Sequence, residues 1–111
     1  MKRIYIVAPY SGDVEKNKQL ALAYTCYVKD HEEHMPICPH IYYDQFCDEE
    51  TERELIMEYC KSDVRSCSEV WVFTDKLTEG MVAEIEEAKR FSKPIEYKKV
   101  PAIYLQGISA G

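Results

Sequence analysis

The segment 78–84, T-E-G-M-V-A-E, combines a hydroxyl, a glycine and carboxylates at the expected start of a helix. Thr78 is a suitable N-cap, and Gly80 would expose the first-turn amides to an anion. Glu84 is followed by Ile85, which we expect in the core, so the Glu84 carboxylate could border a ligand pocket. The alternative is that Glu84 and the glutamates after it are solvated and only favour the positive end of the helix.

A second segment with ligand-binding residue types is the loop 8–13, A-P-Y-S-G-D, which follows an apolar run. Gly12 allows unusual backbone angles and the close approach of a ligand, and Ser11 offers a hydroxyl. The chain contains neither the glycine pattern of dinucleotide-binding loops nor that of ATP-binding loops. The alternative is a plain strand-to-helix turn on which Tyr10 packs as a lid.

His40 and a group of tyrosines follow the second expected strand. An unperturbed histidine has a pKa of about 6.5, which suits a general acid or base. The alternative is that His40 only hydrogen-bonds its own loop. Tyr42 and Tyr43, together with Tyr10, have aromatic faces on which a purine or pyrimidine could stack.

Cysteine and histidine spacing argues against a metal site. The five cysteines are an odd number and form no C-x-x-C pair, so we expect reduced thiols in a cytosolic protein. The spacings of the histidines and cysteines between residues 31 and 47 match no common zinc module, and two prolines interrupt them. We therefore expect neither a metal nor a cofactor. The residues weighed for zinc are His31, His34, Cys38, His40 and Cys47.

The first half of the chain predicts two strands around a helix. The run 4–8 is apolar and β-branched, as in strands buried on both faces of a parallel sheet. A helix over 14–30 follows, and then a short strand at 37–38 between two prolines, ending near His40. We expect a tyrosine-rich loop at 41–46. The predicted core face of the helix comprises Leu20, Tyr24, Tyr27 and Val28.

The second half predicts two helices and two or three strands. Asp48 or Thr51 can cap a helix over 50–67, and the run 70–73, V-W-V-F, is the clearest core strand. A third helix covers 79–91. Further strands are expected at 93–97 and, as a fifth, at 102–105. The predicted buried positions of the two helices are Leu55, Ile56, Tyr59, Cys60 and Val64, and Met81, Ile85, Ala88 and Phe91.

Strands that alternate with helices indicate an α/β fold, a four- to five-stranded parallel sheet with helices on both faces. The length of 111 residues fits a single domain over 1–111. Ligands of such sheets bind beyond the carboxyl ends of the strands, at the switch point in strand order. That rule selects the loops 8–13, 40–47 and 74–81.

Charge restricts the class of partner. With 14 Lys and Arg against 20 Asp and Glu, the net charge of -6 disfavours a binder of polymeric nucleic acid. A helix start can still hold one phosphate locally. The N-terminal apolar run 4–8 is too short for a signal peptide or a membrane span, so we expect a cytoplasmic protein.

The chain resembles the nucleoside 2-deoxyribosyltransferase-like superfamily, whose small members occur in bacteria and phages. The similar motifs cover most of 3–97: I-Y-I-V-A-P-Y-S-G, Asn17, P-x-x-P-H, V-W-V-F, T-E-G-M-V-A-E-I-E-E-A-K and K-P-I. The resemblance implies a flavodoxin-like, or Rossmann-like, fold. It also implies that Glu84 attacks the anomeric carbon of a deoxyribosyl group, expels the base and forms a covalent ester.

Departures from the superfamily pattern point to a subgroup. Thr78 stands where the transferases have an aspartate, and it resembles the phosphate-binding serine of 2'-deoxynucleoside 5'-monophosphate N-glycosidases. Ser11 replaces an arginine of that subgroup, and Cys60 replaces an aspartate, with Asp63 as an off-register substitute. Glu84 lies in E-I-E rather than the E-I-G or E-L-G of active members.

The resemblance therefore implies a nucleotide or ribosyl phosphate ligand, with Glu84 as nucleophile and His40 or Asp75 assisting protonation of the base. It also implies a homodimer or larger homo-oligomer. The departures motivate an alternative, a non-catalytic sensor or sequestering protein for an ADP-ribose-like signal; a purely structural domain is a third. The predicted ligand-binding residues are Ala8, Pro9, Tyr10, Ser11, Gly12, Asn17, Tyr42, Thr78, Glu79, Gly80 and Met81.

Overall fold

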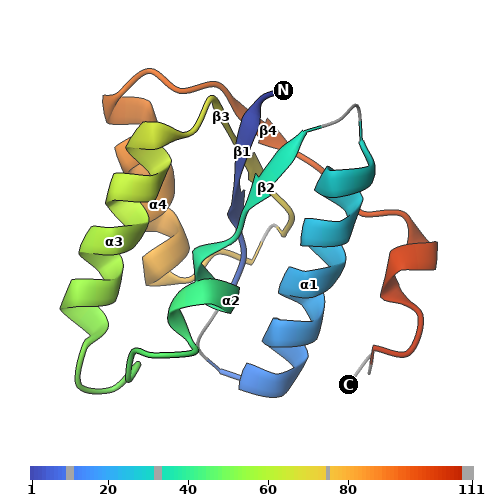
Figure 1. The fold of residues 1–111 in the computed structure, drawn as a ribbon, viewed down its shortest axis with the longest axis horizontal. Helices are drawn as coiled ribbons and strands as arrows, with labels where there is room; N and C mark the ends of the chain where they lie inside the picture. Colours follow the sequence, from blue (N-terminus) through green and yellow to red (C-terminus); the bar gives the residue numbers. More distant parts are fainter. Residues whose placement is uncertain (10–11, 32–33, 75, 109–111) are drawn as a thin grey trace.

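Four parallel strands form one sheet in the computed structural model, which describes residues 1–9, 12–31, 34–74 and 76–108 (Figure 1). The strand order is β2-β1-β3-β4, and Tyr5 on β1 pairs with Ile37 on one side and Val70 on the other. The α/β, flavodoxin-like fold predicted from the alternation of elements is confirmed. The strands are β1 (Arg3–Val7), β2 (Met35–Ile37), β3 (Glu69–Val72) and β4 (Ile95–Tyr97).

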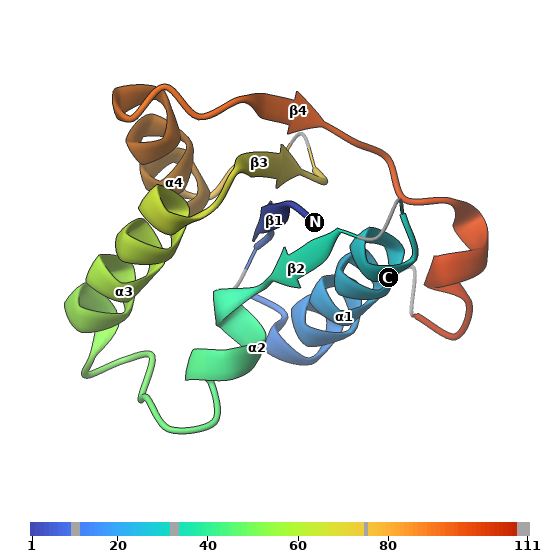
Figure 2. The same cartoon turned by 45° about the horizontal axis from the view of Figure 1, so that its top comes forward.

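Helices cover both faces of this sheet, as predicted (Figure 2). Alternate side chains of β1 go to opposite faces: Ile4 and Ile6 pack with Trp71, whereas Tyr5 and Val7 pack on the other side. This two-sided burial explains why β1 reads as a continuous apolar run. Helix α1 covers the first face, and α3 and α4 cover the second. The helices are α1 (Val14–Asp30), α2 (Pro39–Tyr43), α3 (Arg53–Ser66) and α4 (Glu79–Arg90).

Helix α1 has the predicted bounds and core face. The Asp13 carboxylate caps it by accepting a hydrogen bond from the amide of Lys16 at 3.1 Å. Tyr24 stacks on Phe73 with ring centroids 4.6 Å apart, and Tyr27 packs edge-on against the same ring. Both tyrosines thus belong to the core that joins α1 to the sheet.

Helix α3 begins later than predicted, and two of its predicted core positions are wrong. Its N-cap is Glu52, because Asp48 instead accepts the amides of residues 50 and 51 in a turn before the helix. Leu55 and Tyr59 are 42% and 36% exposed. The face toward the sheet follows Ile56, Cys60 and Val64 at four-residue spacing, so residues one position earlier are rotated away from the core.

Three further expectations are wrong. The segment 41–46 is not all loop, because α2 begins at Pro39, whose fixed φ and missing N–H suit a first helical turn. Residues 102–105 form the 3₁₀ helix η1 (Ala102–Leu105) rather than a strand, and the Tyr104 hydroxyl donates to Asp30 of α1 at 2.9 Å. Phe91, which was predicted to be buried, is 46% exposed at the C-cap of α4, and the Arg65 guanidinium lies over its ring.

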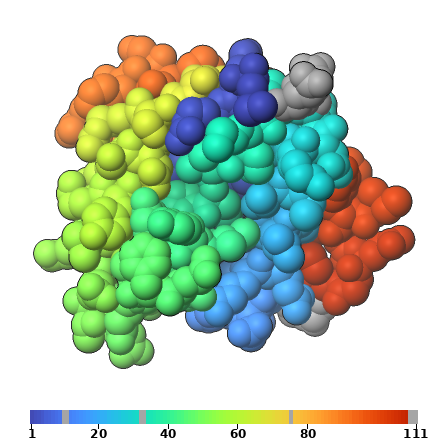
Figure 3. Space-filling view, viewed as in Figure 1, coloured from blue at the N-terminus to red at the C-terminus, as the bar shows by residue number. Residues whose placement is uncertain are grey.

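The strand order places a switch point beside β1, since the chain continues from β1 to β2 on one side and later to β3 on the other. Seen as in Figure 1, α2 and the segment that follows it cover the surface between α1 and α3 (Figure 3). Within the described part of the chain, no helix combines the length and apolar character that crossing a membrane requires.

Candidate functional site

A pocket opens at the carboxyl edge of the sheet, between the end of β1 and helices α2, α3 and α4. Its empty volume, including the opening to solvent, is about 470 Å³. Ala8 contributes from the end of β1 and His40 from α2. Predicted residues from α4 and its cap line another wall, namely Thr78, Gly80, Met81 and Glu84.

Glu84 is a buried carboxyl group in this pocket. Only 1% of the residue is exposed, so the expectation of a solvated glutamate is wrong at this position. The side chain lies on the inner face of α4 with Met81, Ile85 and Ala88, and the Tyr5 hydroxyl of β1 donates a hydrogen bond to its Oε2. Burial raises the pKa of Glu84 to about 8, while the bond from Tyr5 acts in the opposite direction.

His40 is the titratable neighbour of Glu84. Its Nε2 lies 3.8 Å from Oε1 of Glu84, and its side chain is 11% exposed. Burial lowers the pKa of His40 to about 4, and a hydrogen bond to the backbone of Ala8 opposes that effect. At neutral pH the resting pair therefore holds one proton, on Glu84, and the imidazole is neutral.

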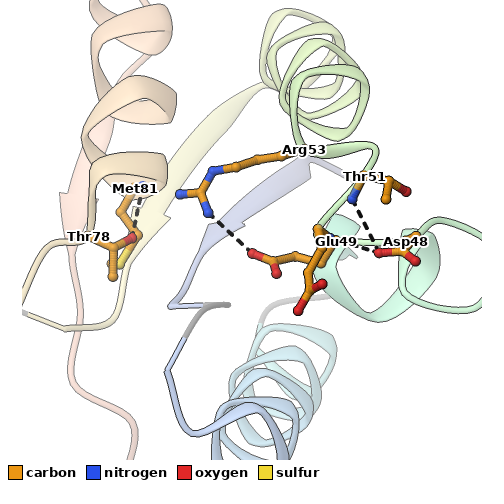
Figure 4. Close-up of polar contacts among 7 residues, drawn as sticks. Asp48, Glu49, Thr51, Arg53, Thr78 and Met81 are labelled. Carbon is orange, nitrogen blue, oxygen red and sulfur yellow. Dashed lines mark hydrogen bonds and ion pairs between the residues drawn. The ribbon is translucent and has the colours of Figure 1, made fainter.

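The start of α4 has the predicted capping geometry. The Thr78 hydroxyl accepts a hydrogen bond from the amide of Met81 at 3.3 Å, which is the contact of an N-cap residue (Figure 4). Gly80 faces α3, and a Cβ added there would lie 3.4 Å from the terminal methyl group of Met57. A small side chain at this position would therefore only touch the flexible end of Met57.

Most of the wall formed by α3 and the turn before it was missed from the sequence, where only Cys60 was singled out, at the position of a superfamily aspartate. Arg53, Ile56, Met57 and Cys60 occur at helical spacing along one face of α3, and Glu49 precedes them. The i, i+3, i+4, i+7 spacing of these four residues is visible in the sequence and could have indicated a common helix face. The pattern begins with a charged residue, however, and shares Ile56 and Cys60 with the face of α3 that packs on the sheet. Burial raises the pKa of Cys60 to about 12, so this thiol stays protonated.

The other predicted site residues are divided between the pocket, the remaining surface and undescribed positions. Tyr10, Ser11 and Asp75 lie outside the described residues. Tyr42 is 60% exposed and packs edge-on against Tyr43 and Phe46, beside a groove along β2. Among described residues predicted to bind a ligand, those that do not line the pocket are Pro9, Gly12, Asn17, Tyr42 and Glu79.

Metal-binding side chains do not gather at this site. Across residues 1–9, 12–31, 34–74 and 76–108, no three His, Cys, Asp or Glu side chains come together as a metal would need. What the pocket offers instead is a buried carboxyl group, an imidazole and an arginine.

Comparison with protein-family models places residues 2–98 in a family described as a domain of unknown function, DUF7768. The chain belongs to the DUF7768 family. A search of curated protein sequences finds no match.

Among solved structures, this DUF7768 protein is similar to a 2-deoxyribosyltransferase from the psychrotolerant bacterium Bacillus psychrosaccharolyticus. That enzyme is described as a biocatalyst for the synthesis of antiviral and antitumoral nucleosides. The TM-score is 0.65 at 12% sequence identity, and the alignment covers 97% of this chain and 83% of the other. At that identity the likeness shows the shared fold, which is the fold that the sequence resemblance implied.

Proposed function

We propose that the pocket binds a nucleoside-type ligand and that the protein cleaves or transfers at its N-glycosidic bond, with Glu84 as the nucleophile. The observation that carries this proposal is the buried Glu84 carboxyl group at the switch-point pocket, with His40 Nε2 3.8 Å away. Carboxylate nucleophiles of this kind form covalent glycosyl esters in retaining glycosidases. The fold shared with a 2-deoxyribosyltransferase supports the assignment.

The resting proton on Glu84 has a role in the proposed reaction. It passes to Nε2 of His40, and the resulting Glu84 carboxylate attacks the anomeric carbon. The electron pair of the broken C–N bond goes to the departing base, which takes the proton from the His40 imidazolium. Water then attacks the sugar ester while His40 accepts its proton, and that proton returns to Glu84. The sum is hydrolysis of the glycosidic bond, with both residues restored.

We further propose that the substrate is a (deoxy)nucleoside 5'-monophosphate. The first-turn amides of α4 that precede Met81 have no intrahelical acceptor, and the Thr78 hydroxyl, which accepts from the amide of Met81, lies beside them at the pocket. Thr78, Gly80 and Met81 would surround the phosphate, with Ala8 beside the sugar. Asp75 stays a second candidate for protonating the base.

The test is incubation of the protein with deoxynucleoside 5'-monophosphates of the common bases, with chromatographic detection of free base. We expect release by the natural chain and at least a hundredfold lower rate for Glu84→Gln, an order-of-magnitude expectation for loss of a nucleophile. Glu86→Gln is the matched control, because Glu86 lies on the same helix with an exposed side chain. Absence of base release from every substrate at high protein concentration would refute the hydrolase.

One observation favours a second function, non-catalytic binding of a nucleotide-derived signal in the same pocket. With its pKa at about 8, Glu84 is protonated at neutral pH and can donate a hydrogen bond to a ligand. Calorimetry separates the two functions: tight binding of an unmodified nucleotide without base release supports the sensor, and turnover excludes it.

A further inference from the structure

The charged groups of the pocket lie at two depths. Glu84 is buried at its inner end, where burial keeps the carboxyl group protonated at neutral pH. Arg53 and Glu49 lie toward solvent, with side chains 57% and 32% exposed. Among the described residues that line the pocket, Arg53 is the sole Lys or Arg. The charge at the opening is therefore set by one arginine and one glutamate.

The ion pair between these two side chains is loose. Nη1 of Arg53 lies 3.4 Å from Oε1 of Glu49, at i, i+4 spacing and in contact with solvent (Figure 4). Exposed pairs of this kind contribute little to stability, so a better anion can replace the carboxylate. A phosphate is such an anion, because its oxygens match the planar guanidinium in two parallel hydrogen bonds.

The start of α4 faces this arginine across the pocket. Figure 4 shows the Arg53 side chain extending from α3 toward Thr78 and Met81, and all three residues line the same pocket. Helices α3 and α4 pack against each other, and Gly80 faces Met57 of α3. A phosphate between the helices would accept hydrogen bonds from the guanidinium on one side and from first-turn amides of α4 on the other.

We propose that Arg53 determines the specificity of this pocket for phosphorylated ligands, exchanging the Glu49 carboxylate for the ligand's phosphate. Glu49 is the competing group: it neutralises the opening when no ligand is bound and weakens phosphate binding. The inference rests on the proposed function in taking the phosphorylated ligand to be a nucleotide. It adds a residue from α3 that selects monophosphate over free nucleoside.

The test is calorimetry with three ligands: a deoxynucleoside 5'-monophosphate, the corresponding nucleoside and ribose 5-phosphate. For Arg53→Gln we expect a Kd about 10- to 100-fold higher for both phosphorylated ligands, since bonds to charged groups are worth that much, with the nucleoside unchanged. Glu49→Gln should lower the Kd of the phosphorylated ligands about threefold or more by removing the competing carboxylate. Both effects should shrink as NaCl is added.

Arg90→Gln is the matched control, because Arg90 lies at the opposite end of α4 with its side chain 72% exposed. Thermal unfolding of each variant verifies that it folds. An Arg53 variant that binds all three ligands as the natural chain does, or that loses nucleoside and monophosphate equally, overturns the inference.

The same measurements separate the inference from the proposed function. Binding of ribose 5-phosphate that depends on Arg53, without base release from any nucleotide, supports the inference and refutes the hydrolase. Base release from nucleoside and monophosphate at equal rates, unaffected by Arg53→Gln, supports the hydrolase and overturns the inference. Failure of all three ligands to bind overturns both.

Discussion

The buried pair of Glu84 and His40 predicts an unusual dependence of stability on pH. In the unfolded chain the two groups titrate near the ordinary values of 4.5 and 6.5, whereas burial shifts their pKa values to about 8 and about 4 in the folded protein. The order of proton loss is therefore reversed on folding. We take Glu84→Gln as the perturbation, because it removes the titrating group and keeps the side-chain volume.

The sign and size follow from the number of protons bound in each state. Between pH 4.5 and 6.5 the folded pair and the unfolded pair each hold one proton, so these groups leave stability unchanged. Between pH 6.5 and about 8 the folded state holds one and the unfolded chain none, so stability falls as pH rises. At about 1.4 kcal/mol for each pH unit, the loss is about 2 kcal/mol.

In Glu84→Gln only His40 remains. Because its pKa is depressed by folding, stability rises with pH from about 4 to 6.5, and from the same relation the gain is about 3 kcal/mol. Above pH 6.5 the contribution of this site becomes flat. The variant should therefore lose the alkaline decrease of the natural chain and expose an increase on the acid side.

Urea unfolding followed by fluorescence of the single tryptophan, Trp71, measures this at pH 4.5, 5.5, 6.5, 7.5 and 8.5. Trp71 is 2% exposed, so its emission should report loss of the core. Glu86→Gln on the exposed face of the same helix is the control and should follow the natural chain. Equal pH profiles of the natural chain and Glu84→Gln would refute the reasoning, as would an equal change in Glu86→Gln.

Two further predictions concern the neighbours of this pair. Tyr5→Phe removes the hydroxyl that donates to Glu84, so the pKa of Glu84 should rise further. In the pH profile of base release, the alkaline pH of half-maximal rate should then move upward. Tyr104→Phe, at the distant η1 contact, should leave that profile unchanged. Thr78→Ala removes the N-cap of α4 and should lower the free energy of unfolding by about 1 kcal/mol in urea titrations, whereas Thr51→Ala, in the exposed turn before α3, should change it little. An unshifted profile, or equal stability of the two threonine variants, would contradict these assignments.

Much of the fold was predictable because its signals are local. The apolar runs at β1 and β3 identify strands buried on both faces, and Asp13 and Thr78 cap the helices that follow the first and third strands. The start of α3 was missed because Asp48 and Thr51 satisfy cap chemistry in sequence, while in the structure the Asp48 carboxylate holds a turn instead. The segment 102–105 has strand-like composition, yet Tyr104 anchors it to α1.

The candidate site was predictable at the positions that follow strands. Ala8, His40, Thr78, Gly80 and Glu84 line one pocket, as the rule for parallel sheets implies. Arg53 and Glu49 were missed because charged residues at the start of a helix and in the turn before it ordinarily indicate a solvated surface. Only the packing of α3 beside α4 turns these residues toward the pocket.

By itself, the sequence determined the four strands, the three long helices between them, the helix cap at Thr78 and the candidate residues at the strand ends. Periodicity and capping, which identify them, act over a few neighbouring residues. The tertiary structure alone decided the burial that shifts the pKa values of Glu84 and His40, and it brought Arg53 to the same pocket as the start of α4. Burial and opposing helix faces depend on residues far apart in the chain. Tyr5 and Glu84, which meet in one hydrogen bond, are 79 residues apart.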